Sequence, residues 1–217
     1  MLVRPVYNIL LLPDVSYYFK KEFFTGFGEE ELTPGSDILF IFLKNENEQE
    51  EYTEEDFYPI GLSARVDAVS EEDTISVRTL ERVEVTDLEP VNGVLAAAAS
   101  IRPEVTDLTD EEAGQKFGQI RGSLLRFVQG YQWGLWARSF ILQRKNMYDL
   151  ACSLSDYLNL NAEEKYHILS VDSRRERYDR IINAITEFME IAKVSEEAQS
   201  AQKDDQEQLY REAAIKK

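Results

Sequence analysis

Residues 60–69, IGLSARVDAV, alternate apolar and polar side chains, which is the two-residue period of a strand with one buried face. A polar segment at 70–73 follows, and the alternation resumes over 75–79, so we expect a hairpin. The preceding run at 38–43, ILFIFL, is continuously apolar and is typical of a strand that is covered on both faces. These three segments predict a sheet in the first half of the chain.

Weaker signals extend this sheet in both directions. The apolar run at 6–12, which is closed by Pro13, predicts a short strand. Val83 and Val85 continue the strand pattern as a meander, and Asn92-Gly93 is a strong turn signal before a further strand at 94–101. Five or six short strands predict a compact, mostly antiparallel barrel or sandwich.

From about Thr109 the apolar residues change to helical spacing, which continues to Leu135. Asp107 or Thr109 is a suitable N-cap, with acidic residues in the first turn. Glycines at every fourth position predict either close approach of another element or a break in this helix. These glycines are Gly114, Gly118 and Gly122.

Further helices follow. A short one is expected at 147–158, and Asn161 with Glu164 and Ser173 with Glu176 resemble capping boxes. Apolar residues at 178–192 then fall on one helical face, and the stripe thins beyond Ala192. The sequence therefore predicts an α+β fold: the mostly antiparallel barrel or sandwich, then an α-helical bundle that ends in a long helix.

We divide the chain into a β-rich domain at 1–107, a helical subdomain at 108–190 and the start of an extended helix at 191–217. No Gly, Asn or Pro follows the last helical turn before Lys217. We therefore expect this chain to be the N-terminal piece of a longer protein.

The charge is uneven. The formal net charge is −17, and residues 1–110 carry 8 Lys and Arg against 24 Asp and Glu. Such an acidic half repels phosphate and argues against nucleic-acid binding through it. We expect the acidic surface to disfavour acidic protein partners and to favour basic or neutral ones, with salt weakening this bias.

The motifs of common catalytic and cofactor sites are absent from the sequence. It contains no G-x-x-x-x-G-K-[ST] or G-x-S-x-G motif, and it has one cysteine, Cys152, and one histidine, His167. The acidic loop at 44–56 lacks the ligand order of an EF-hand. We expect no catalytic residue, no cofactor, no metal and no membrane span, and we expect a cytoplasmic protein.

Aromatic residues are the remaining candidates for a functional surface. They cluster without a clear period in the first segment, and core packing explains most of them. The alternative is an adaptable apolar patch that binds other proteins. The candidates for substrate contact are Tyr17, Tyr18, Phe23, Phe24 and Phe27. A second aromatic group lies near the glycine-rich helix: Tyr131, Trp133, Trp136 and Phe140.

Several motifs resemble the N-terminal region of Lon-type ATP-dependent proteases, in the same order along nearly the whole chain. The β-rich half contributes LLPDV at 11–15, DILFI at 37–41, DFYPIGLSARV at 56–66 and ISVRTLERVEV at 75–85. The helical half contributes LNLNAEEK at 158–165, Arg177 and QEQLYRE at 206–212. One departure is YFKK at 18–21, where the family usually has a Phe-Pro-Gly turn, and another is the glycine-rich stretch at 114–136.

This resemblance implies a β-rich domain of the pseudouridine-synthase-associated (PUA-like) type, a helical bundle and a long helix. It also implies a hexameric, ATP-driven protease with a Ser-Lys dyad, whose N-terminal region captures substrates and assists assembly. No catalytic residue can be carried over to this chain. Our main hypothesis is a non-catalytic substrate-recognition and assembly region that binds unfolded or degron-bearing proteins.

Two other hypotheses remain open. In one, the region is an oligomerisation scaffold. In the other, it is a stand-alone Lon-domain adaptor. A scaffold would use the long helix for self-association between subunits. The candidate residues for this contact are Tyr178, Ile181, Ile185, Phe188 and Leu209.

Overall fold

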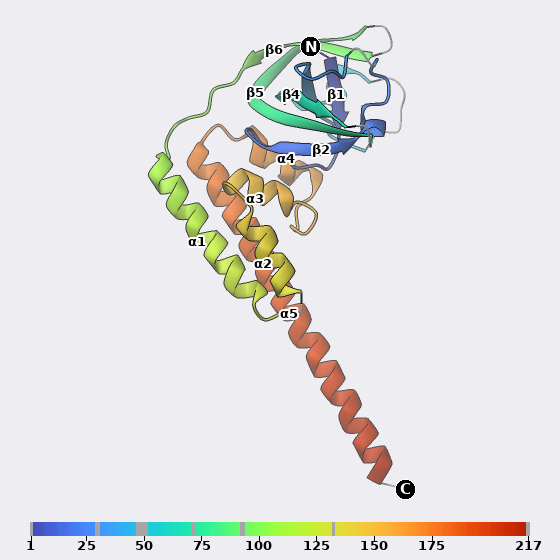
Figure 1. Cartoon of the computed structure of the whole chain (residues 1–217), viewed down its shortest axis with the longest axis vertical. Helices are drawn as coiled ribbons and strands as arrows, with labels where there is room; N and C mark the ends of the chain where they lie inside the picture. The colour runs from blue at the N-terminus through green and yellow to red at the C-terminus, as the bar shows by residue number, and fades with distance from the viewer. Residues whose placement is uncertain are drawn as a thin grey trace.

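The computed structural model describes residues 2–28, 31–46, 52–70, 73–91, 94–131 and 133–215. Within these ranges the side chains of residues 2, 90, 91, 94 and 196–215 are not described. A small β-barrel stands at one end, helices α1–α4 pack below it, and the last helix continues beyond them (Figure 1). The predicted order of barrel, bundle and long helix is confirmed.

Six strands form one mixed sheet in the order β2-β5-β4-β3-β1-β6, and β6 pairs again with β5, which closes the sheet into a barrel. The β1–β3 pairing is parallel, and the other pairings of the described strands are antiparallel. This confirms the mostly antiparallel arrangement. The strands are β1 (Leu2–Val6), β2 (Ser16–Lys20), β3 (Asp37–Phe42), β4 (Ile60–Val69), β5 (Thr74–Val91) and β6 (Val94–Ile101).

Strand β3 is buried on both faces, as its continuous apolar sequence predicts. Ile38, Phe40 and Phe42 belong to the main core, which the barrel shares with the helices. Leu39 and Ile41 point to the opposite face and belong to a smaller core inside the barrel. The strand therefore separates two apolar clusters.

The predicted strand at 6–12 is wrong. Strand β1 ends at Val6, and the backbone then takes positive φ angles at Asn8 (53°) and Asp14 (57°), which no extended strand allows. Leu10–Leu12 are buried although they lie outside any strand. The Thr79 hydroxyl donates to the Leu12 carbonyl (2.6 Å) and satisfies part of this buried backbone.

The segments expected as separate strands at 75–79 and 83–85 belong to the single strand β5. A register shift between Thr86 and Glu89, with a positive φ of 49° at Asp87, marks a bulge in its second half. The long strand can pair with β2 and β4 and also with β6. The predicted turn at Asn92-Gly93 and part of the turn at 70–73 lie outside the described residues.

The helices begin where the capping signals predict. Thr109, rather than Asp107, caps α1, and its side chain forms a reciprocal capping box with Glu112. Asn161 and Glu164 do the same for α4, and the Glu176 amide donates to Ser173 Oγ (2.9 Å). The α-helices are α1 (Asp110–Val128), α2 (Gly134–Leu142), α3 (Met147–Ser153), α4 (Ala162–Ser170) and α5 (Arg174–Ile215). Two short 3-10 helices are η1 (Lys21–Phe24) and η2 (Glu54–Asp56).

The glycines of α1 do not mark a close approach or a break, so that prediction is wrong. The helix is continuous over 19 residues, although it ends at Val128 and not at Leu135 as the apolar spacing predicted. A Cβ atom added at Gly114 or Gly118 would meet nothing within 4 Å, and one at Gly122 would meet only the far end of Arg126. These glycines lie in open space.

Two buried arginines join the barrel to the bundle at the C-terminal end of α4. Arg82 from β5 donates to the Val171 carbonyl (2.9 Å) and to Asp172 Oδ1 (3.0 Å). Arg177 from α5 donates to the carbonyl groups of Ile168 and Val171, and it pairs with Glu104. The unpaired carbonyl groups of this helix end are therefore satisfied from both sides of the junction.

Candidate functional site on the helical bundle

The predicted contact residues at η1 lie mainly in the main core. Phe24 is 1% exposed and contacts the rings of Phe19, Phe23 and Phe27 edge-on. Phe23 is partly buried and stacks on Phe19 with 4.4 Å between ring centroids. These rings are packed against one another, and Phe24 has no surface to offer to a partner.

The side chains of Tyr17 and Tyr18 point to opposite faces of the sheet, because successive residues of a strand such as β2 alternate between its two faces. The Tyr17 hydroxyl accepts from the Leu12 amide (3.0 Å) and donates to Cys152 Sγ (2.9 Å), which ties the barrel to α3. Tyr18 is 74% exposed. Of these two candidates, Tyr18 is free to contact another protein.

Phe27 lies at the edge of a surface groove of about 550 Å³ between η1 and the start of β5. The groove combines the ring of Phe27 with basic Lys20 and Lys21 and with acidic Asp73. Besides the exposed Tyr18, Phe27 is therefore a candidate for substrate contact, because it lines a surface hollow.

The candidate assembly residues of α5 are largely internal. Tyr178, Ile181 and Ile185 are at most 5% exposed and belong to the core that α5 shares with the other helices. Phe188 is partly buried and meets Phe127 of α1 at 5.9 Å between ring centroids. In this fold the three buried residues cannot reach a second subunit. The side chain of Leu209 lies outside the described residues.

Helix α2 has an apolar outer face. Its inner face consists of Gly134, Ala137 and Ile141, which are buried at a spacing of three and four residues. A Cβ atom at position 134 would overlap the Val128 carbonyl group, so the glycine lets α2 start against the end of α1. Because Leu135 and Trp136 follow this position, they point outward and are 86% and 67% exposed.

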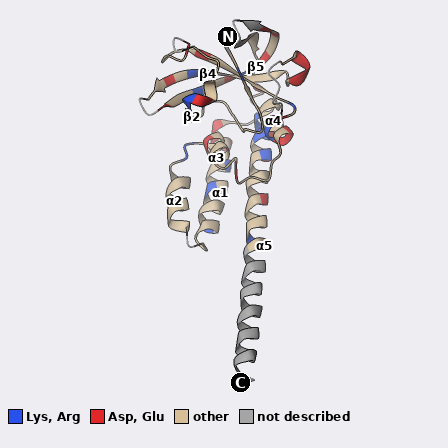
Figure 2. Ribbon diagram, turned by 90° about the vertical axis from the view of Figure 1, so that its right-hand side faces the viewer, with Lys and Arg blue, Asp and Glu red and all other residues tan. Residues whose placement is uncertain are grey.

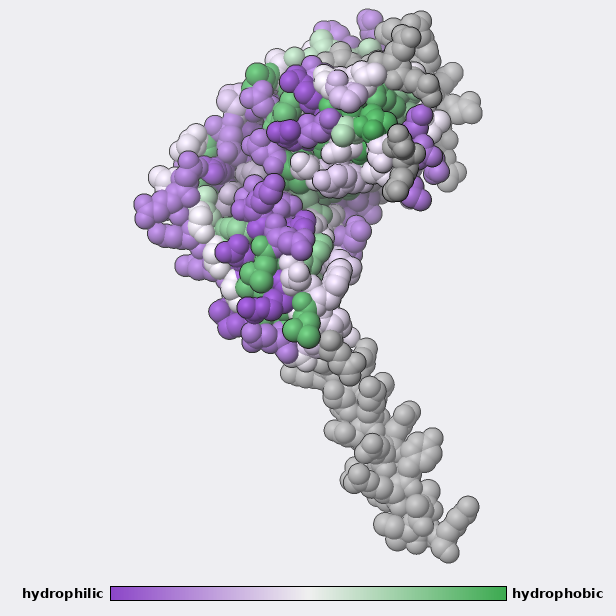
Figure 3. Space-filling model, viewed as in Figure 1, coloured by the Kyte–Doolittle hydropathy of each residue, from purple (hydrophilic) through white to green (hydrophobic). Residues whose placement is uncertain are grey.

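The α2 face continues at both ends. Trp133, just before the helix, is 48% exposed, and Leu142, its last residue, is 49% exposed. Figure 3 shows hydrophobic side chains on the surface of the bundle, separate from those on the barrel. We call Trp133, Leu135, Trp136, Arg138, Leu142 and Lys145 the α2 face. Large exposed apolar side chains gathered on one helix are typical of a protein-binding surface.

A ladder of aromatic rings connects the α2 face with the long helix. Trp133 contacts Tyr131 at 4.8 Å between centroids, Tyr131 contacts Phe127 at 4.9 Å, and Phe127 contacts Phe188 of α5. Phe188 in turn lies 6.4 Å from Tyr157, which is 61% exposed. These ring contacts join Trp133 of the α2 face to the bundle core.

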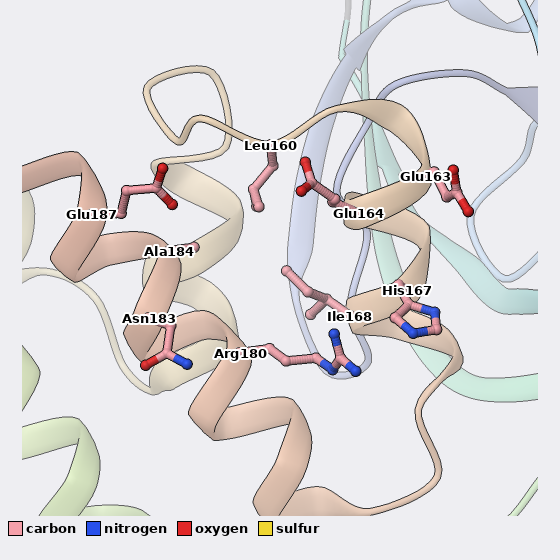
Figure 4. Close-up of a pocket in the computed structure, with 9 residues that line it drawn as sticks. All are labelled: Leu160, Glu163, Glu164, His167, Ile168, Arg180, Asn183, Ala184 and Glu187. Carbon is pink, nitrogen blue, oxygen red and sulfur yellow. The ribbon is translucent and has the colours of Figure 1, made fainter. Parts of the chain in front are cut away.

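A pocket of about 330 Å³ lies between α4 and α5 (Figure 4). Figure 4 shows Arg180 reaching from α5 toward α4, and its guanidinium donates to Glu176, one turn earlier on α5 (2.7 Å). Glu187 accepts from Asn159, and Glu164 accepts from the Asn161 amide. His167 is on its rim, and the pocket offers no nucleophile with a neighbouring base.

The remaining reactive groups are also structural. Burial raises the pKa of the Cys152 thiol to about 12, so it stays protonated and is a poor nucleophile. Hydrogen bonds from Arg102 and Arg82 lower the pKa of Asp172 to about 2, which keeps it charged at the junction. Among the described residues, no group of three or more His, Cys, Asp or Glu could hold a metal. None of the described helices is long and apolar enough to cross a membrane.

The α2 face was noted in the sequence only as a second aromatic group. The signal that could have found it is the three-and-four spacing of its small and apolar inner residues, which places Leu135 and Trp136 on the outside. The α4–α5 pocket had no sequence signal, because its lining comes from two separate helices.

Comparisons with known proteins identify the family. The profile of the ATP-dependent protease La (LON) substrate-binding domain matches residues 5–187. A Lon protease from Clostridium beijerinckii is 23% identical over 221 residues, and the match covers 99% of this chain and 27% of that protein. The chain therefore spans about a quarter of the length of this curated relative.

A solved structure agrees in fold. The N-terminal domain of the Mycobacterium avium complex Lon protease superposes with a TM-score of 0.55 at 15% identity, covering 85% of this chain and 97% of that one. These three comparisons bear out the resemblance seen in the motifs. The chain belongs to the family of LON substrate-binding domains of ATP-dependent protease La.

Proposed function

We propose that this chain is the non-catalytic substrate-recognition region of a Lon-type ATP-dependent protease and that it binds unfolded or degron-bearing proteins. The exposed apolar α2 face carries this proposal, because an unfolded chain offers the apolar side chains that such a face can cover. Membership of a family of substrate-binding domains supports it. Cleavage and ATP hydrolysis would belong to other parts of the protease.

Binding at each site would be weak, because a face that accepts many sequences cannot form tailored pockets. Six copies in a hexamer would raise the overall affinity through avidity. We place the protein in the cytoplasm, because a single free cysteine is usual in a reducing compartment.

We also propose the division into domains at 1–107, 108–190 and 191–217. Strand β6 ends at Ile101 and α1 begins at Asp110, which supports the first boundary. The shared core and the junction of Arg82 and Arg177 favour a barrel and bundle that move together.

A scaffold role is the second candidate, and α5 favours it. This helix continues beyond the bundle (Figure 1), and Ile191 and Val194 near the point of exit are 49% and 65% exposed. Pairing of these helices between subunits would cover such residues. The solution mass of the full chain at high concentration separates a monomer from a self-associating segment.

The test of the main proposal is binding of the full chain to a permanently unfolded, fluorescently labelled protein, with the folded form of the same protein as control. We expect binding to the unfolded form only, measured by fluorescence anisotropy. Equal binding of both forms, or no binding at high micromolar concentration, would leave the scaffold role as the better account.

A further inference from the structure

The α2 face lies in a stretch whose charge is opposite to that of the chain as a whole. Residues 113–148 contain six basic residues and no Asp or Glu, whereas the chain carries a net charge of −17. Figure 2 shows the acidic segments mainly on the barrel and none along α2. The exposed apolar side chains of the α2 face are therefore set among positive charges.

Part of this positive charge is neutralised within the fold. Lys116 pairs with Asp179 (2.6 Å), and Arg144 lies 3.4 Å from Asp149. Arg138 and Lys145 are exposed, and no carboxylate of the described residues lies within ion-pair distance of either. These two cations remain available to a ligand.

The spacing on α2 brings charge and apolar surface together. Leu135, Arg138 and Leu142 are three and four residues apart, so they follow one another along one side of the helix. Trp136 lies beside this row and stacks on Phe140 with 5.5 Å between centroids. A ligand that covers the row meets apolar contacts on both sides of a cation.

We propose that the α2 face binds polypeptide segments in which Asp or Glu residues are interspersed with apolar side chains. The apolar side chains would cover Leu135, Trp136 and Leu142, and the carboxylates would meet Arg138 and Lys145. This inference rests on the proposed function and names the substrate class of its site. It reverses, for this face, the preference for basic partners that the acidic barrel suggests.

A polypeptide fits this face better than a nucleic acid does. Trp133 and Trp136 offer rings to a base, but the aliphatic Leu135 and Leu142 do not, and the excess of carboxylates on residues 1–110 repels a polyphosphate. A short acidic and apolar segment can bind α2 without approaching the barrel.

The two tryptophans of the chain, Trp133 and Trp136, both lie on the α2 face, so intrinsic tryptophan emission reports on its occupancy. The experiment adds two short tryptophan-free peptides to the full chain. The peptides share their apolar residues and carry Asp and Glu in one case and Lys and Arg in the other. We expect the acidic peptide to shift the emission and to bind about tenfold more tightly at low salt, with the difference shrinking as salt rises.

Arg138→Glu should abolish this preference, and Lys20→Glu, a charge reversal at an exposed position of the barrel, should leave it unchanged. Equal binding of both peptides, or acidic-peptide binding that Arg138→Glu does not weaken, would overturn the inference. So would an emission change with a single-stranded oligonucleotide or anionic vesicles but not with the peptide. If a labelled unfolded protein binds without any emission change, this inference fails and the proposed function stands; if it does not bind, both fail.

Discussion

The segments at 17–27 and 131–142 are both rich in aromatic residues, yet the fold treats them differently. In the first, the rings of Phe19, Phe23 and Phe24 pack together in the main core, beside the strands of the acidic barrel. In the second, Leu135 and Trp136 point into solvent from a basic helix. Aromatic density in a sequence therefore does not identify a binding surface, because pairing within the fold decides which side chains stay exposed.

The largest expected difference between the two segments is in stability. Phe24→Ala removes a ring that is 1% exposed and leaves a cavity, so it should lower the free energy of unfolding by about 3–5 kcal/mol. Trp136→Ala, at 67% exposure, should change it by no more than about 0.5 kcal/mol. Urea unfolding followed by circular dichroism measures both. A larger loss for Trp136→Ala would contradict the assignment of core and surface.

The stability of the protein should also depend strongly on the junction between the barrel and the bundle. Arg177→Met removes the arginine that donates to the Ile168 carbonyl and one of the partners of Val171 and Glu104, so we expect a loss of about 3 kcal/mol. Arg180→Met is the matched control on the same helix: its partner is the surface residue Glu176, and its expected effect is about 0.5 kcal/mol. Similar losses for the two variants in thermal unfolding would refute a structural role for the buried arginine.

Substitution of glycines should change the free energy of unfolding least. The expected change has opposite signs in the helical bundle and in the barrel. Gly118→Ala in α1 should raise the free energy of unfolding by about 0.5–1 kcal/mol, because the added Cβ meets nothing and the unfolded chain loses freedom. Gly61→Ala in β4 should lower it by roughly 1–3 kcal/mol, since the Cβ would lie 2.8 Å from the Phe40 carbonyl oxygen. A destabilised Gly118→Ala would mean that another element does approach α1.

The local features of this fold were predictable from the sequence. Thr109 and Asn161 cap their helices through contacts with residues three positions away, and the alternation over 60–69 reports directly on one strand. Such signals need no knowledge of distant residues. The family motifs pointed to the same architecture.

The features that were missed depend on distant contacts. The backbone at Leu10–Leu12 is not a strand because Thr79, far along the chain, satisfies part of it. Arg82 and Arg177 meet only after the barrel and the bundle have packed. The exposure of Trp136 depends likewise on how α2 lies against α1, so the more exposed aromatic segment could not be chosen from composition alone.

The most direct test of the account compares the two aromatic segments in binding a permanently unfolded protein. Leu135→Ser with Trp136→Ser removes the centre of the α2 face, and Tyr18→Ser removes a similarly exposed ring from the barrel. We predict that the α2 double variant binds about tenfold more weakly and that Tyr18→Ser binds like the unchanged chain, with circular dichroism confirming that both are folded. Full binding by the α2 double variant, with a loss in Tyr18→Ser, would place recognition on the barrel and contradict the account.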